Sequence, residues 1–144
     1  MAKKDSIATG NLPELLELLN QILKLEYSLI IHYPRLASAI KDESARKRAL
    51  QLGSASVHHA DTVAKAISKL GGKPYWSFEP FPEESDMLKI FQRQLEKEKL
   101  ALQLHRQSAY LMMDALLRDK FDQLAKEEES HIQTVEYILS RLTQ

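Results

Sequence analysis

The chain has 144 residues, in which 20 lysines and arginines balance 20 aspartates and glutamates, so its formal net charge is zero. This length fits one domain with a single hydrophobic core. The balanced charge provides no field that would attract nucleic acid or an anionic membrane, so neither is expected as a partner. The absence of cysteine excludes disulfides, thiolate metal sites and thiol nucleophiles. Any bound metal must therefore be held by oxygen and nitrogen atoms.

The first ten residues, MAKKDSIATG, are polar and lack the apolar stretch of a secretion signal. No uncharged run approaches the ~20 residues that a membrane-spanning helix needs. We therefore expect a soluble, cytoplasmic protein that consists of one domain over residues 1–144. Residues 1–11 are expected to be disordered or extended.

Apolar residues recur at helical spacing between Leu12 and Ile40, which predicts one amphipathic helix over residues 12–40. Pro13 fits the first turn of such a helix, whereas Pro34 lies in its interior and predicts a kink. Asp42 is a suitable N-cap for a second helix, which we expect over residues 42–70, followed by two glycines.

The sequence repeats itself at an offset of 72 residues. Glu26 corresponds to Glu98 (26 + 72), and His59 corresponds to His131 (59 + 72). Helical periodicity alone would not align glutamate with glutamate and histidine with histidine, so we infer that one helical hairpin has been duplicated. The offset places two further helices at residues 84–112 and 114–142, the second of them capped by Asp114.

The segment between the hairpins, residues 71–83, is too rich in proline and glycine to be helical and carries four aromatic residues. The twelve residues 71–82, fully extended, reach about 40 Å at ~3.3 Å each. A helix of some 28 residues is about 42 Å long at ~1.5 Å per residue, so this crossover can run nearly the length of a bundle. We therefore predict an all-α four-helix bundle whose two hairpins run in opposite senses. The aromatic residues of the crossover are expected to cover the side of the core.

The repeated polar residues fall at the middle of the four predicted helices, where such a bundle brings them to one height. His59 and His131 lie one turn away on the same helix faces, because residues three apart are neighbours on a helix. A buried carboxylate is costly unless it is paired or bound to metal. With no lysine or arginine in this layer, we predict a cation site. Its predicted ligands are Glu26, His59, Glu98, Glu128 and His131.

The chain resembles the ferritin-like di-iron carboxylate proteins, and the rubrerythrin and bacterioferritin branches in particular. That family places one Glu on each of two helices and a Glu-x-x-His motif on each of the other two. Here the corresponding phrases are LEYSLIIHY around Glu26, LEKEKLALQLH around Glu98 and AKEEESHIQTVEYIL around Glu128 and His131. The resemblance covers residues 12–142 and implies a ferritin-like bundle with a di-iron site.

The sequence departs from these relatives in three respects. The electron-transfer domain of rubrerythrin needs four cysteines, which are absent here. Val57 stands where bacterioferritin has its haem-ligating methionine, so no haem is expected. The chain ends at Gln144, directly after the fourth helix, with no residues for the fifth helix that helps to close ferritin cages. We therefore expect a homodimer or small homo-oligomer rather than a 24-subunit shell.

A fourth departure is Ser56, which replaces the glutamate of the first Glu-x-x-His motif. In the family the two carboxylates of these motifs usually bridge the metals, so only Glu128 is left as an obvious bridge. The sequence fits a weaker, asymmetric di-metal site. It also fits a single ion bound by Glu98, Glu128 and His131, with or without Glu26.

Oxygen and imidazole ligands with open positions suit iron or manganese, and zinc also fits. The resemblance implies a non-haem iron protein that oxidises ferrous iron or reduces peroxide. The alternative is a ferritin-like helical scaffold or interaction protein with a degenerate or empty site. The sequence identifies no electron donor.

Two further histidines lie near the predicted ligands. His58 is rotated about 100° from His59 on the helix, so we expect it at the surface. His105 is seven residues from Glu98, roughly 10 Å along the helix axis, and is expected to pack or to hydrogen-bond rather than to bind metal.

Overall fold

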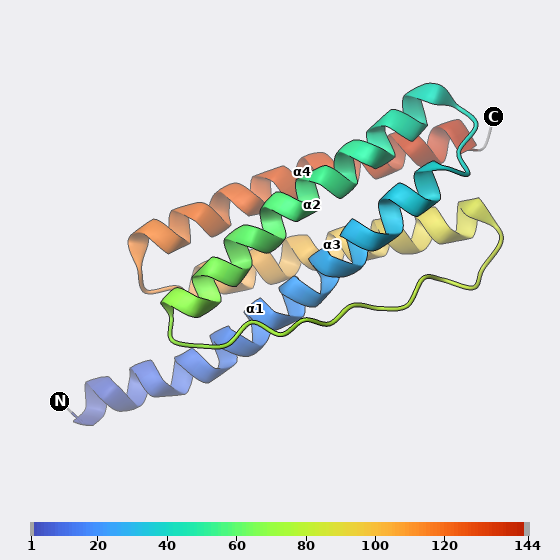
Figure 1. Ribbon diagram of the computed structural model, residues 1–144. Helices are drawn as coiled ribbons and strands as arrows, with labels where there is room; N and C mark the ends of the chain where they lie inside the picture. Colours follow the sequence, from blue (N-terminus) through green and yellow to red (C-terminus); the bar gives the residue numbers. More distant parts are fainter. Residues whose placement is uncertain (1, 143–144) are drawn as a thin grey trace.

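The protein is a bundle of four α-helices (Figure 1), seen in a computed structural model that describes the backbone of residues 2–142 and the side chains of residues 11–142. The helices are α1 (Ala2–Ala37), α2 (Glu43–Lys69), α3 (Met87–Leu111) and α4 (Ala115–Leu142). The described residues contain no β-strand. The predicted all-α class is confirmed.

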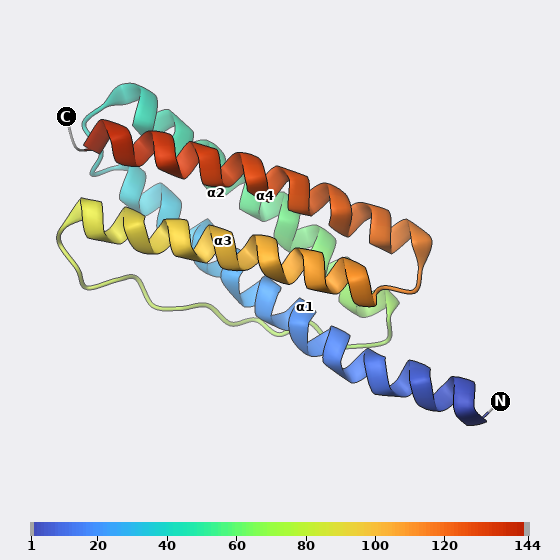
Figure 2. The same ribbon diagram turned by 180° about the vertical axis from the view of Figure 1, so that it is seen from behind.

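The two hairpins are α1 with α2 and α3 with α4, and within each hairpin the two helices pack closely along their length. The hairpins meet through α1 against α3 and through α2 against α4. Figures 1 and 2 show that α1 and α3 run in opposite directions and that the crossover extends along the outside of the bundle. Every helix is therefore antiparallel to both of its neighbours, as the duplicated hairpin predicts.

Aspartate side chains begin three of the helices. The Asp42 carboxylate accepts a hydrogen bond from the Ala45 amide, and the Asp114 carboxylate accepts bonds from two amides of the first turn of α4. Asp86 caps α3 in the same manner, although the sequence analysis did not single it out. At the end of α2, Gly71 adopts a φ of 86°, a left-handed conformation that glycine accepts without strain.

Several helix boundaries differ from those predicted. Helix α1 begins at Ala2 rather than near residue 12, whereas a disordered or extended start was expected. Pro13 was interpreted as a first-turn residue, but the backbone continues through it and leaves one carbonyl without its usual amide donor. Helix α1 ends at Ala37, not residue 40, and α3 begins at Met87, not residue 84, because the Asp86 cap sets its first turn.

The crossover, residues 70–86, is anchored to α1 by hydrogen bonds. The Ser28 hydroxyl accepts a bond of 2.8 Å from the Glu79 amide, and His32 Nε2 donates to the Glu79 carbonyl at 3.0 Å. The crossover aromatics do not form the expected cover, because their side chains are mostly in solvent. Trp76 is 84% exposed although its ring stacks on Tyr27 at 4.8 Å. Of the four aromatic residues, only Phe81 is partly buried.

The core consists of two apolar clusters, one toward each end of the bundle. One cluster contains Leu19, Ile22 and Phe121, and the other contains Leu29 and Phe91, together with their neighbours. A layer of buried polar side chains lies between these clusters, near the middle of the bundle. None of the described helices combines the length and the hydropathy that a membrane span requires.

Asp42 gives a pH-dependent test of the fold, because it joins the start of α2 to Arg141 near the end of α4 at 2.8 Å. The hydrogen bonds from Arg141 and the Ala45 amide hold the Asp42 pKa below its ordinary value of 3.8. The stability that this carboxylate contributes is therefore present above about pH 4 and is lost as the pH falls through the lowered pKa. Asp42→Asn keeps the cap and loses the ion pair.

We expect Asp42→Asn to be less stable than the wild type at neutral pH, with the difference shrinking below about pH 4. Urea unfolding of both proteins across this range measures the effect. A difference that stays the same at every pH would contradict the assigned ion pair.

Candidate metal centre

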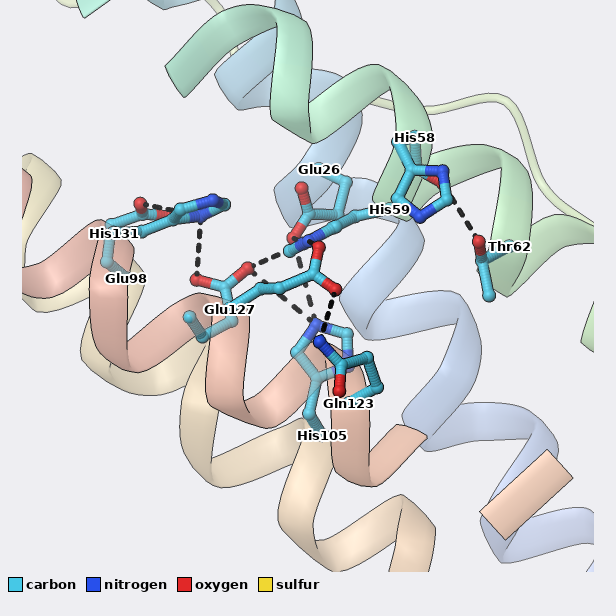
Figure 3. Close-up of polar contacts among 10 residues, drawn as sticks. Glu26, His58, His59, Thr62, Glu98, His105, Gln123, Glu127 and His131 are labelled. Atoms are coloured by element: carbon cyan, nitrogen blue, oxygen red, sulfur yellow. Dashed lines mark hydrogen bonds and ion pairs between the residues drawn. The ribbon is translucent and has the colours of Figure 1, made fainter. Parts of the chain in front are cut away.

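Six ionisable side chains from all four helices converge in the polar layer (Figure 3). They are buried between the two apolar clusters of the core. Helix α1 contributes Glu26 and α2 contributes His59. Helix α3 contributes Glu98 and His105, and α4 contributes Glu128 and His131.

Four of these side chains form one group of potential ligands, with one atom from each lying within 4.8 Å of all the others. His59 Nδ1 lies 2.9 Å from Glu128 Oε1 and 3.5 Å from Glu26 Oε1. His105 Nε2 lies 3.8 Å from those same two oxygens. The first group therefore offers two carboxylate oxygens and two imidazole nitrogens.

A second group consists of Glu98, Glu128 and His131. His131 Nδ1 lies 3.5 Å from Glu98 Oε2 and 3.5 Å from Glu128 Oε2. Glu128 thus presents Oε1 to the first group and Oε2 to the second. One carboxylate that faces two ligand sets through its two oxygens has the arrangement of a bridge between two cations.

The histidine rings are positioned by their neighbours. The rings of His59 and His131 stack at 5.0 Å, and His105 meets His59 edge-on at 5.8 Å. On its outer side, His59 Nε2 donates to Glu127 Oε1 at 3.2 Å. The Glu127 side chain is 34% exposed and lines a surface cavity of about 360 Å³ between α2 and α4. A carboxylate on the outer nitrogen fixes the tautomer of a histidine and directs its other nitrogen inward.

The electrostatics of the layer are unbalanced without a cation. Burial, together with the charge of Glu26, raises the pKa of Glu128 to about 8. Burial and the Glu128 charge likewise raise the Glu98 pKa well above 4.5. Burial opposes protonation of His59, but the carboxylates of Glu128 and Glu26 outweigh it and raise the His59 pKa to about 11. Burial lowers the pKa of His105 and of His131, which favours their neutral forms.

Many polar atoms of this layer have no hydrogen-bond partner among the described residues. Both oxygens of Glu26 and of Glu98, both nitrogens of His105, and His131 Nδ1 are buried without one. No lysine or arginine among the described residues pairs with Glu26, Glu98 or Glu128. Leaving such atoms unsatisfied is costly, and metal ions satisfy carboxylates and imidazoles together. The donor set fits divalent metal ions.

The structure brings together all five residues that the sequence predicts as ligands: Glu26, His59, Glu98, Glu128 and His131. It adds His105, which the sequence analysis assigned to packing or hydrogen bonding. That assignment used the rise along the axis alone. His105 joins the group of Glu26, His59 and Glu128 rather than the group that contains Glu98, so its distance from Glu98 along α3 does not exclude it. His58 is exposed, as predicted.

Ser56 lies one turn before His59, is 1% exposed, and its hydroxyl has no hydrogen-bond partner. Glu26 belongs to the group with His59, not to the group with His131. The predicted single ion bound by Glu98, Glu128 and His131 therefore does not include Glu26.

Residues 16–144 match the family model described as the ferritin-like domain. The chain belongs to the ferritin-like domain family. A comparison of this ferritin-like protein with curated proteins finds no match.

Solved structures of the same fold come from several bacteria. A ferritin-like diiron-carboxylate protein from Bacillus anthracis has a TM-score of 0.81 at 21% identity, over 90% of this chain and 97% of that one. A dodecameric, bacterioferritin-related thioferritin from Bacteroides fragilis has a TM-score of 0.80 at 19% identity, over 99% of this chain and 95% of that one. Desulfovibrio desulfuricans bacterioferritin has a TM-score of 0.79 at 19% identity, over 94% of this chain and 84% of that one. At these identities, the structures support the fold of this ferritin-like protein.

Glu98 provides a pH test of the buried layer in metal-free protein. Burial raises its pKa well above the ordinary value, so the folded protein retains this proton to a higher pH than the unfolded chain, which ionises it above about pH 4.3. The stability from this difference is complete below that pH and is lost as the pH rises toward the folded pKa. Glu98→Gln removes the ionisation at nearly constant volume.

We expect metal-free Glu98→Gln to gain stability relative to the wild type as the pH rises from about 5 to about 8. The gain should be a few degrees in melting temperature, since 1 kcal/mol corresponds to roughly 2–4 °C at this size. Thermal unfolding in the presence of a chelator measures it. A gain that does not change with pH would mean that Glu98 is not buried as described.

Proposed function

We propose that this protein is a non-haem metalloprotein that binds two divalent ions, preferably iron, in its polar layer. The observation that carries the proposal is the position of Glu128, whose two oxygens face the two ligand groups. The residues proposed as metal ligands are Glu26, His59, Glu98, Glu128 and His131. Membership of the ferritin-like domain family supports this assignment.

The proposed activity is the oxidation of ferrous iron or the reduction of peroxide. A pair of ferrous ions at these ligands would supply the electrons for reducing oxygen or peroxide. The donor set supports iron or manganese, because carboxylates and imidazoles leave open coordination positions, and zinc fits the same atoms. No haem is expected, since Val57 is 53% exposed and offers no ligand atom.

The chain itself prepares the site for metal. His59 must release the proton on Nδ1 before it binds an ion, and Glu127 remains hydrogen-bonded to its other nitrogen. The apolar clusters above and below keep the layer dry, which strengthens each carboxylate–cation attraction. Glu127 connects the layer to the surface cavity and marks a route for ions and protons.

Charge balance distinguishes this centre from one with four carboxylates. Two divalent ions bring four positive charges, whereas Glu26, Glu98 and Glu128 bring three negative ones. One positive charge is left over, because Ser56 carries no carboxylate. A bound anion such as hydroxide would neutralise it, so we expect weaker or asymmetric loading.

We further propose that the protein acts as a homodimer or small homo-oligomer. Ile31 on α1 and Leu50 and Val57 on α2 are 41%, 46% and 53% exposed, and a second copy would cover such apolar side chains. These side chains also favour the second candidate, an interaction scaffold in which the Ser56 substitution has left the centre empty.

Substitution of His131 tests the proposed centre. His131→Ala removes the one imidazole of the second ligand group, so iron bound after anaerobic loading should fall from about two ions per chain to about one or fewer. Metal analysis gives the stoichiometry, and circular dichroism checks that the helices persist.

His58→Ala is the matched control, because it removes an exposed imidazole that belongs to neither ligand group, although its ring lies 6.0 Å from that of His59. It should bind as much iron as the wild type. Two ions per chain in His131→Ala would refute the ligand assignment, and a wild type that binds no iron, manganese or zinc would favour the scaffold.

A further inference from the structure

The duplication is broken at two positions beside the metal centre. Ser56 corresponds to Glu128 (56 + 72), and Tyr33 corresponds to His105 (33 + 72). The first copy has therefore lost a carboxylate, while the second copy carries an imidazole where the first carries a phenol. Both substitutions lie in buried positions of the same layer, so they change the set of ligands that the layer offers.

His105 is placed as a ligand rather than as a hydrogen-bonding residue. Its side chain is fully buried, and neither ring nitrogen has a hydrogen-bond partner. Nε2 lies 3.8 Å from Glu26 Oε1 and from Glu128 Oε1, which is too long for hydrogen bonds. Ligand atoms that share one ion, each about 2.1 Å from it, are separated by up to ~4.2 Å. The two distances therefore suit a shared ion.

The ring of His105 is held in place by packing. Phe121 lies against it at 5.9 Å between ring centroids, and His59 meets it edge-on at 5.8 Å. These aromatic contacts fix the ring without using either nitrogen. The nitrogen that faces Glu26 and Glu128 remains available to a cation.

We propose that His105 is a metal ligand that takes the place of the carboxylate missing at Ser56. This inference rests on the metal centre proposed above and specifies its composition as three carboxylates and three imidazoles. The ion held by Glu26, His59, His105 and Glu128 has four protein ligands. The ion held by Glu98, Glu128 and His131 has three, so its open positions make it the side at which a small oxidant binds.

Cobalt(II) is a suitable probe, because its visible spectrum reports the number and type of ligands. We expect the wild type to bind two Co²⁺ per chain in equilibrium dialysis. His105→Ala should retain one ion and bind the other roughly tenfold more weakly or worse, since even residues that only support a ligand cost 10–100-fold. Its cobalt spectrum should change, and added imidazole should restore both the spectrum and the second ion.

Three variants keep the test specific. His105→Gln preserves most of the volume without an imidazole and should lose the second ion as His105→Ala does. His32→Ala removes another buried imidazole, one that hydrogen-bonds the crossover, and should bind two ions. Ser56→Glu added to His105→Ala returns a carboxylate to the layer and should restore the second ion.

Two failures are distinguishable. A wild type that binds no cobalt overturns the metal centre itself. A wild type that binds two ions, with His105→Ala and His105→Gln binding two at unchanged affinity and with unchanged spectra, leaves the centre intact and overturns the role of His105.

Discussion

Three carboxylates buried in one layer of a small helical bundle are the constraint on which the rest of the structure depends. Glu26, Glu98 and Glu128 have no lysine or arginine partner among the described residues, and the two apolar clusters exclude water from both sides. In metal-free protein the layer relies on the raised pKa values of Glu98 and Glu128 and on a protonated His59. Divalent ions bound in this layer would remove the imbalance, and metal binding would then stabilise the fold.

The duplicated hairpin explains how such a layer forms. Opposite senses of the two hairpins bring equivalent residues to one height, and the long crossover makes that arrangement possible. In a layer formed by two equivalent hairpins, a substitution in one hairpin makes the layer asymmetric. Ser56 and His105 are changes of this kind, one in each copy. Their combined effect is an asymmetric set of potential ligands, with four side chains in one group and three in the other.

Much of this arrangement was predictable from the sequence. The repeat of Glu26 and His59 at Glu98 and His131 predicted the fold, the opposite hairpins and four of the six clustered side chains, and the Glu-x-x-His motif added Glu128. His105 was missed because its distance was judged from Glu98 on the same helix, whereas its partners Glu26, His59 and Glu128 come from the other three helices. The start of α1 was missed because Pro13 was interpreted as a first-turn residue. The exposure of the crossover aromatic residues was missed because their hydrophobicity was taken as evidence of burial. These features depend on where side chains point and on where a helix begins, and the spacing of residues in the sequence determines neither.

The central claim is that Glu128 bridges two metal ions through its two oxygens. Anomalous diffraction from crystals grown with ferrous iron under anaerobic conditions tests it most directly. We expect two iron peaks, one on each side of the Glu128 carboxylate, about 3.5–4 Å apart as in two-metal sites generally. One peak on a single side of Glu128, or no peak in the polar layer, would contradict the account.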